Sequence, residues 1–122
     1  MPGFTNTESQ ATLDVRFPTT GATDHVAYSV NGTSEFAGLA RTPIGATGWS
    51  AATSADPSVK ANANVLLSAA ATTGGTVTHF AIYSALTAGT QRTDWTALTA
   101  SRTVATGDKL EHAAAAISVT LT

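Results

Sequence analysis

The sequence contains no cysteine, so neither a disulfide nor a thiolate metal site can form. Charge is also scarce: 11% of the 122 residues are charged, and the formal net charge is −2. Without a basic cluster, the chain is not expected to bind the phosphate backbone of a nucleic acid. No hydrophobic run approaches the roughly 18 residues of a membrane span. We therefore expect neither nucleic acid nor membrane among the partners.

Large side chains and targeting signals are scarce as well. Aromatic residues make up 7% of the chain, and much of its 43% hydrophobic content is alanine, which buries little area. A single chain of this kind would be only marginally stable, so we expect association with neighbouring chains. The N-terminal sequence MPGFTNTESQ has neither the basic cluster nor the apolar core of a secretory signal, so standard export is not expected.

Near the N-terminus the sequence has the pattern of a helix N-cap. Thr5 is followed three residues later by Glu8, the spacing of a capping box, and this predicts a short helix that ends before Pro18. The alternation of LDVRF, residues 13–17, would also allow a strand. We favour the helix.

We expect one domain over residues 1–122, with residues 1–8 as an extended arm. The arm MPGFTNTE has one large apolar side chain, Phe4, beside a proline and a glycine. Burying Phe4 within the same chain would not offset an ordering cost of roughly 1 to 2 kcal/mol per residue. The arm is therefore expected to order against a neighbouring subunit, with Phe4 as a candidate interface residue.

The remaining chain has the pattern of short strands separated by turns. The turns include Asn31-Gly32 and Asp56-Pro57, and glycines with Pro43 break residues 34–52 into short extended pieces. A helix through Ala69–Ala71 is allowed by propensity, but we favour a strand just before it. Together these segments predict an all-β fold, a small antiparallel β-sandwich or barrel with a short N-terminal helix. The expected strands are residues 25–30, 65–67, 76–84, 94–98, 101–105 and 116–122.

The segment GGTVTHFAIYSA places a lone histidine, His79, behind two glycines. The glycine pair is not a phosphate loop, because no Gly-Lys-Ser/Thr follows and a strand comes next where such loops lead into a helix. Simple alternation puts His79 on one face with Val77, Ala81 and Tyr83. We expect a hydrogen-bonded structural imidazole rather than a catalytic group.

Other patterns of chemistry are weak. The three histidines, His25, His79 and His112, show no short ligand spacing, so no metal site is predicted. The acids are isolated, no serine lies in a Gly-x-Ser-x-Gly elbow, and a cysteine nucleophile is excluded. We expect no enzyme activity and no cofactor.

The two tryptophans are the strongest contact candidates. Trp95 falls in an expected strand, where a core position is favoured. Trp49 lies in glycine-rich surroundings that suit a core position and a contact surface equally. It is therefore a candidate interface residue, either as a protein anchor or as a carbohydrate platform.

From about Ser34 onward the chain resembles a family of small virion proteins of tailed actinobacterial phages, labelled tail-fibre-like or head/tail accessory proteins. The resemblance rests on the order of five pieces: SEFAGLARTPI, WSAA, GGTVTHFAIYSA, WTALTASRTVATGDKL and AAAISVTLT. It departs from the family at LTAGTQRTD, where a Gly-Gly turn is common, and at the alanines before the last piece, where a glycine is common. In this family the histidine recurs within a scaffold, and no catalytic residues are known to transfer.

The resemblance implies a non-enzymatic structural protein of a phage particle, assembled in the host cytoplasm. The leading expectation is a capsid decoration or accessory protein that stabilises the shell, because the chain lacks the repeats or heptads of a long fibre stalk. A tail-fibre or tail-tip module is the alternative, and a carbohydrate-binding module using Trp49 is a third. Expected partners are further copies of the chain, as a homotrimer, and other virion proteins such as the major capsid protein.

Overall fold

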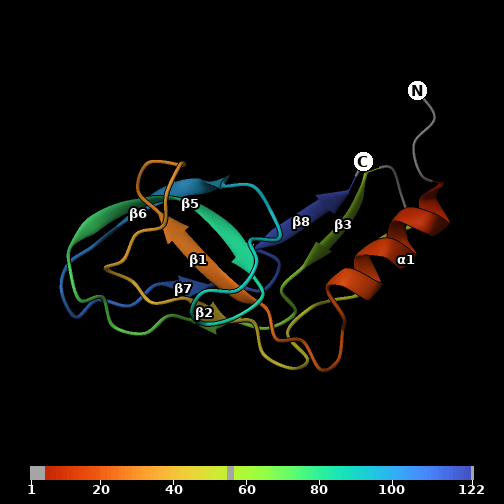
Figure 1. Ribbon diagram of the computed structural model, residues 1–122, viewed down its shortest axis with the longest axis horizontal. Coiled ribbons are helices and arrows are strands. Elements are labelled where there is room, and N and C mark those ends of the chain that lie inside the picture. Colours follow the sequence, from red (N-terminus) through yellow and green to blue (C-terminus); the bar gives the residue numbers. More distant parts are fainter. Residues whose placement is uncertain (1–4, 55–56, 122) are drawn as a thin grey trace. The chain divides into compact units, whose positions relative to one another are not determined.

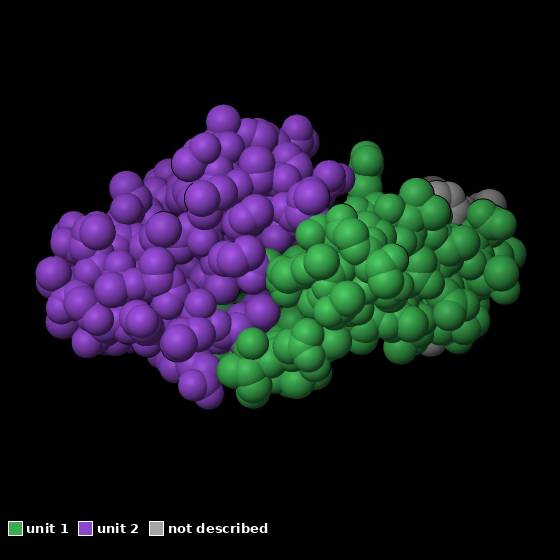
Figure 2. Space-filling model, turned by 90° about the horizontal axis from the view of Figure 1, so that it is seen from below, with its two compact units in different colours: residues 1–22, 44–65, 112–122 green, residues 23–43, 66–111 purple. Residues whose placement is uncertain are grey.

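The computed structural model describes residues 5–54 and 57–121. These residues cluster into two compact units, coloured separately in Figure 2. Unit 1 is built from residues 1–22, 44–65 and 112–122, and unit 2 from residues 23–43 and 66–111. Neither unit is a continuous stretch of chain. That residues 1–122 behave as one domain remains a prediction, which coincident unfolding transitions in both units would support.

Unit 1 begins with the predicted helix, α1 (Asn6–Arg16). Its N-cap is Thr5, whose Oγ1 accepts a hydrogen bond from the Glu8 N–H at 3.2 Å. At the other end the Phe17 N–H donates to the Leu13 carbonyl at 2.8 Å, and the helix stops before Pro18 as expected.

The helix changes the expected bounds of the N-terminal arm. Residues 6–8 are helical rather than extended, because the capping interaction of Thr5 fixes the first turn. Residues 1–4, and with them the candidate interface residue Phe4, lie outside the described residues.

Two antiparallel strands complete unit 1: β3 (Ser58–Ala61) and β8 (Ser118–Leu121). The predicted alternation of the last strand is confirmed where side chains are described, since Ile117 and Val119 are buried while Ser118 and Thr120 are exposed. Sequence analysis missed β3, because its buried residues, Ser58 and Lys60, are polar. The turn expected at Asp56-Pro57 falls in part outside the described residues.

A buried amide fixes the chain as it enters β8. The Asn62 backbone N–H donates to the Ile117 carbonyl at 3.0 Å, and Asn62 Oδ1 accepts from the Ile117 N–H at 2.9 Å. Asn62 Nδ2 donates to the Ala113 carbonyl at 2.9 Å. One buried side chain thus satisfies backbone groups that would otherwise be buried without partners.

Unit 2 is organised around a four-stranded antiparallel sheet in the order β2-β1-β5-β6 (Figure 1). The strands are β1 (His25–Ser29), β2 (Thr42–Pro43), β5 (Gly75–Tyr83) and β6 (Thr96–Val104). Two further short strands pair with each other: β4 (Leu66–Leu67), and β7 (Glu111–His112), of which Glu111 belongs to unit 2. The chain is therefore a small antiparallel all-β protein with one N-terminal helix, as the sequence predicted.

The centre of the sheet is buried on both faces. Residues 26–29 of β1 and residues 80–82 of β5 are buried in succession, without the alternation of a half-exposed strand. Tyr28 Oη lies 2.5 Å from Thr42 Oγ1, and burial of the phenol raises the pKa of Tyr28 to about 12 despite that hydrogen bond. After β1 the chain turns at Asn31-Gly32, as predicted, with Gly32 at φ 76°.

One expectation for unit 2 was wrong and another was confirmed. The strands expected at residues 94–98 and 101–105 form one strand, β6, with an irregularity in its middle. The region of Ala69–Ala71 is not helical, in agreement with the strand that we favoured just before it.

Candidate assembly interface

Trp49 is not at the surface. The residue is 2% exposed, and its ring packs edge-on against Phe17 with the ring centroids 5.4 Å apart. Its backbone forms a β-bridge with Asn62. A ring enclosed in this way cannot be a platform for a carbohydrate or an anchor for a partner, so of the two readings the structure supports the core position.

Trp95 is more exposed than the core position that was expected for it. It precedes β6 instead of lying within it, and it is half-buried. Its ring is tilted against Tyr83, with the centroids 6.2 Å apart. The β-propensity of the residues that follow Trp95 led to its assignment within the strand.

His79 packs against the turn that follows β1. A Cβ added to Gly32 would lie 3.0 Å from two ring atoms of His79, so the ring sits directly over that glycine. The Thr78 hydroxyl is 2.8 Å from His79 Nδ1. A structural role for His79 remains a prediction, and this packing supports it. No group of three His, Cys, Asp or Glu residues within 5–54 and 57–121 could hold a metal ion.

A groove of about 410 Å³ runs between residues 35–41 and residues 86–88 of unit 2. Arg41 contributes to its wall: Nε and Nη2 each donate to one carboxylate oxygen of Glu35 at 2.9 Å. Arg41 Nη1 donates to the carbonyls of Ala85 and Ala88, at 2.9 and 2.7 Å, and the guanidinium stacks on Tyr83 at 3.9 Å. Because these contacts occupy the donors of the guanidinium, we interpret Arg41 as a clamp that holds residues 85–88 in place, and not as an anion site.

Glu35 also affects the titration of Arg41. The hydrogen bonds from Arg41 to Glu35 raise the pKa of the arginine further, although burial acts in the opposite direction. The clamp is therefore charged throughout the accessible pH range.

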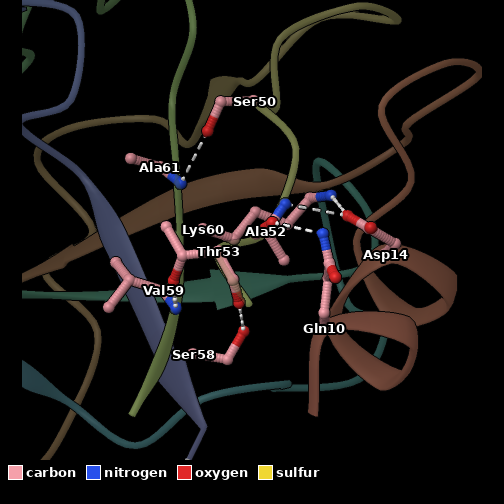
Figure 3. Close-up of polar contacts among 9 residues, drawn as sticks. All are labelled: Gln10, Asp14, Ser50, Ala52, Thr53, Ser58, Val59, Lys60 and Ala61. Atoms are coloured by element: carbon pink, nitrogen blue, oxygen red, sulfur yellow. Dashed lines mark hydrogen bonds and ion pairs between the residues drawn. The ribbon is translucent and has the colours of Figure 1, made fainter. Parts of the chain in front are cut away.

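A second polar cluster, drawn in Figure 3, connects α1 to β3 within unit 1. Lys60 is 0% exposed, and its Nζ donates to Asp14 Oδ1 at 2.6 Å. The Ala52 N–H donates to the same oxygen at 3.0 Å, and Gln10 Nε2 donates to the Ala52 carbonyl at 3.0 Å. Burial would raise the pKa of Asp14, but the hydrogen bonds from Lys60 and Ala52 and the charge of Lys60 lower it overall. The cluster connects the helix to β3 and to Ala52 and holds the helix in place.

The outer strand of the unit 2 sheet, β6, is the most accessible regular element of that unit. Of its nine residues only Val104 is buried and only Leu98 is half-buried. It is an edge strand, with β5 as its neighbour in the sheet. An edge strand exposes backbone N–H and C=O groups that another chain can pair with.

The middle of β6 has no partner in the described β5–β6 ladder. Val77 pairs with Arg102 and His79 pairs with Ala97, so β5 advances by two residues while β6 advances by five. Residues 98–101 therefore bulge opposite Thr78. This bulge explains why the sequence pattern resembled two strands, since their expected gap at residues 99–100 falls inside it.

The opposite edge of the same sheet is protected. β2 has two residues, and one of them is Pro43, which lacks an N–H to donate. β6 has no proline and carries one charged residue, Arg102. Its Nη1 lies 3.4 Å from the Glu111 carbonyl. Of these two edges, β6 is the better candidate for contact with another chain.

Comparison with known proteins identifies the family. Residues 4–120 match the model of a family described as podophage GP4 fiber I protein gp80. No curated protein matches the chain. The described residues contain no helix that is long and apolar enough to cross a membrane. The family description supports a structural protein of the phage virion, without the narrower assignment to actinobacterial phages. The chain belongs to the podophage GP4 fiber I protein gp80 family.

Proposed function

We propose that this protein is a non-enzymatic structural subunit of a phage fibre. The match of residues 4–120 to a fibre protein family carries this proposal. The accessible strand β6 fits it, because a subunit of a multi-chain structure needs a surface that can pair with another chain. The charged groups beside the groove of unit 2 bind each other, which fits a structural role better than a catalytic one.

Capsid decoration, the leading expectation from the sequence, is the competing function. The lack of a repetitive stalk sequence favoured it, but a fibre can include globular modules without such repeats. The family description names a fibre, and we therefore give the fibre assignment precedence. Association as a homotrimer and contact with the major capsid protein remain predictions.

Counting and locating the protein in purified particles tests the assignment. We expect quantitative mass spectrometry to give a few copies to a few tens per particle, and gold-labelled antibody to mark the tail or its fibres. Hundreds of copies, with label distributed over the shell, would instead establish decoration. Label on neither structure in intact particles would contradict both functions.

A further inference from the structure

The turn after β1 contains the Asn31-Gly32 pair, and hydrogen-bond donors converge on its asparagine side chain. Asn31 Oδ1 accepts from the backbone N–H groups of Thr33 and Ser34, at 2.9 and 3.0 Å. It also accepts from the hydroxyl of Thr33 at 3.0 Å and from the hydroxyl of Ser29 at 3.1 Å. These four donors polarise one amide carbonyl, as the donors of an oxyanion hole do.

Ser29 connects this carbonyl to the backbone nitrogen of the next residue. The Gly32 N–H donates to Ser29 Oγ at 2.9 Å, and Ser29 Oγ in turn donates to Asn31 Oδ1. Ser29 is 0% exposed, and the Asn31 N–H also donates to its Oγ at 3.2 Å, so the hydroxyl is held in position. One hydroxyl therefore joins a nitrogen nucleophile to the oxygen of the carbonyl that this nitrogen can attack.

We propose that Asn31 deamidates in the folded chain, with Ser29 as the proton relay. The Gly32 nitrogen attacks Asn31 Cγ while its proton passes to Ser29 Oγ and the Ser29 proton passes to Oδ1. The new bond from nitrogen to Cγ closes a ring. The bond from Cγ to Nδ2 then breaks, the Oδ1 proton moves to Nδ2, and ammonia leaves a succinimide. Water opens the succinimide to aspartate or isoaspartate, so the reaction balances with water as its co-reactant.

The fold requires glycine after Asn31 for reasons of its own, and this leaves the nucleophile unobstructed. Gly32 has φ 76°, and a Cβ added there would lie 3.0 Å from the His79 ring. A glycine nitrogen has no side chain beside it to hinder the attack. Asn31 is exposed, so water can reach the succinimide.

The aspartate product retains the contacts that define the turn. Its carboxylate can accept from the same backbone N–H groups, those of Thr33 and Ser34, and charge-assisted hydrogen bonds are stronger than neutral ones. The amide Nδ2 donates to Ser34 Oγ at 3.3 Å, and after deamidation this hydroxyl can donate to the carboxylate instead. Each modified copy would gain a negative charge and keep its turn.

Peptide mass spectrometry of the protein during incubation measures the reaction at each asparagine. The folded chain is compared with the chain unfolded in guanidinium chloride at the same pH and temperature, which separates the effect of the fold from that of the Asn-Gly sequence. We expect Asn31 to react about tenfold faster in the folded chain, less than the roughly hundredfold or more of one oxyanion-hole donor because the site is exposed. Asn6 and Asn64, which precede threonine and valine, are the internal references.

Substitutions at two positions test the relay. Ser29→Ala removes it and should lower the folded rate to that of the unfolded chain or below. Because Ser29 is buried, Thr33→Val provides a second variant: Thr33 is exposed, and the substitution removes one hydroxyl donor while keeping the N–H. It should slow the folded reaction about threefold, and Thr33→Ser should restore the rate. Circular dichroism and thermal melting must first show that each variant folds.

The unfolded chain supplies the matched reference for each variant. In guanidinium chloride all variants should react like the unmodified chain, because the relay is not formed there. An equal or slower reaction of the folded chain would show that the turn protects Asn31 and would overturn the proposal. A faster reaction that both Ser29→Ala and Thr33→Val leave unchanged would overturn the role of the hydroxyls. None of these rates depends on where the protein lies in the particle, so the proposal is tested separately from the fibre assignment.

Discussion

The two units each bury a cation but support it differently. In unit 1 the Lys60 side chain is fully buried, and in unit 2 the Arg41 side chain is almost as enclosed. Both partner carboxylates are partly open to solvent, with Asp14 at 36% and Glu35 at 33% side-chain exposure. The ammonium of Lys60 donates to one carboxylate oxygen, whereas the guanidinium of Arg41 contacts a carboxylate, two carbonyls and a ring.

The chemical type of a buried cation determines how much stability is lost when one of its partners is removed. A guanidinium has five donors in a planar fork, so it retains partners after one is removed. An ammonium held by one carboxylate has no such reserve, and a buried charge without a partner is costly. Unit 1 should therefore be more sensitive than unit 2 to loss of the acid.

Asp14→Ala should have the largest effect of the changes considered. It leaves Lys60 buried without its carboxylate, and it also removes the acceptor of the Ala52 N–H. We expect a loss of about 2 to 4 kcal/mol of unfolding free energy, below the full value for a buried pair because water reaches Asp14. Urea unfolding followed by Trp49 fluorescence in a Trp95→Phe background would measure it.

The controls for Asp14 separate charge from packing. Lys60→Met removes the buried charge and keeps the volume, so it should cost less than about 1 kcal/mol and should largely rescue Asp14→Ala. A Lys60→Met effect as large as that of Asp14→Ala would mean that the pair itself stabilises the protein, contrary to our account.

The same pair predicts a pH dependence. The folded pKa of Asp14 lies below its ordinary value of 3.8, so the unfolded chain binds the proton more readily. The contribution of Asp14 is fully present above about pH 4 and is lost as the pH falls through the lowered folded pKa. Unfolding between pH 5 and pH 2 should show this loss in the unmodified chain, and Asp14→Ala should weaken it.

Glu35→Gln should have a smaller effect in unit 2. The amide removes the charge but keeps one acceptor, and Arg41 retains the Ala85 and Ala88 carbonyls and the Tyr83 ring. We expect a loss of about 1 to 2 kcal/mol. Arg41→Lys, which removes the fork, should cost more than Glu35→Gln. If Glu35→Gln cost as much as Asp14→Ala, the proposed difference between the units would be wrong.

Much of the fold could be predicted from local patterns. The capping box of Thr5 and Glu8 specified the helix, and the Asn31-Gly32 pair located the turn after β1. β3 was missed because its buried residues are Ser58 and Lys60, and polar residues become interior only when partners satisfy them. Ser58 donates to the nearby Thr53 carbonyl, but the partner of Lys60, Asp14, is 46 residues away in the sequence.

The candidate interface was harder to predict than the fold. Trp49 and Trp95 have the same side chain, and their burial depends on Phe17 and Tyr83, which are distant in sequence. The importance of β6 lies in what fails to cover it, and local sequence cannot reveal an absent neighbour. The small residues in the middle of β6 were the one signal, and they appeared as a gap between two strands.

Gly21 and Gly32 have similar backbone conformations, one in each unit, but different surroundings. Gly21 in unit 1 has φ 71°, and a Cβ added there would meet nothing within 4 Å; Gly32 in unit 2 has φ 76°, and an added Cβ would meet the His79 ring at 3.0 Å. Gly21→Ala should cost about 1 kcal/mol from the left-handed backbone alone. Gly32→Ala should cost about 1 kcal/mol more, because the ring must also move. Equal losses in thermal unfolding would show that the ring yields freely and that His79 is not held in place.

The smallest expected effect concerns the first turn of α1, the helix that carries Asp14. Thr5→Ala removes the acceptor of the Glu8 N–H and should cost about 1 kcal/mol. Thr7, two residues later, is exposed, and Thr7→Ala keeps the cap. It should be neutral or stabilise by a few tenths of a kcal/mol, because alanine is the better helix former. If helix fraying also loosens the ion pair, Thr5→Ala should cost less in a Lys60→Met background than in the unmodified chain. Chemical unfolding of the four combinations gives this coupling. An unchanged cost in both backgrounds would mean that the first turn stabilises the helix locally and does not contribute to burying Lys60.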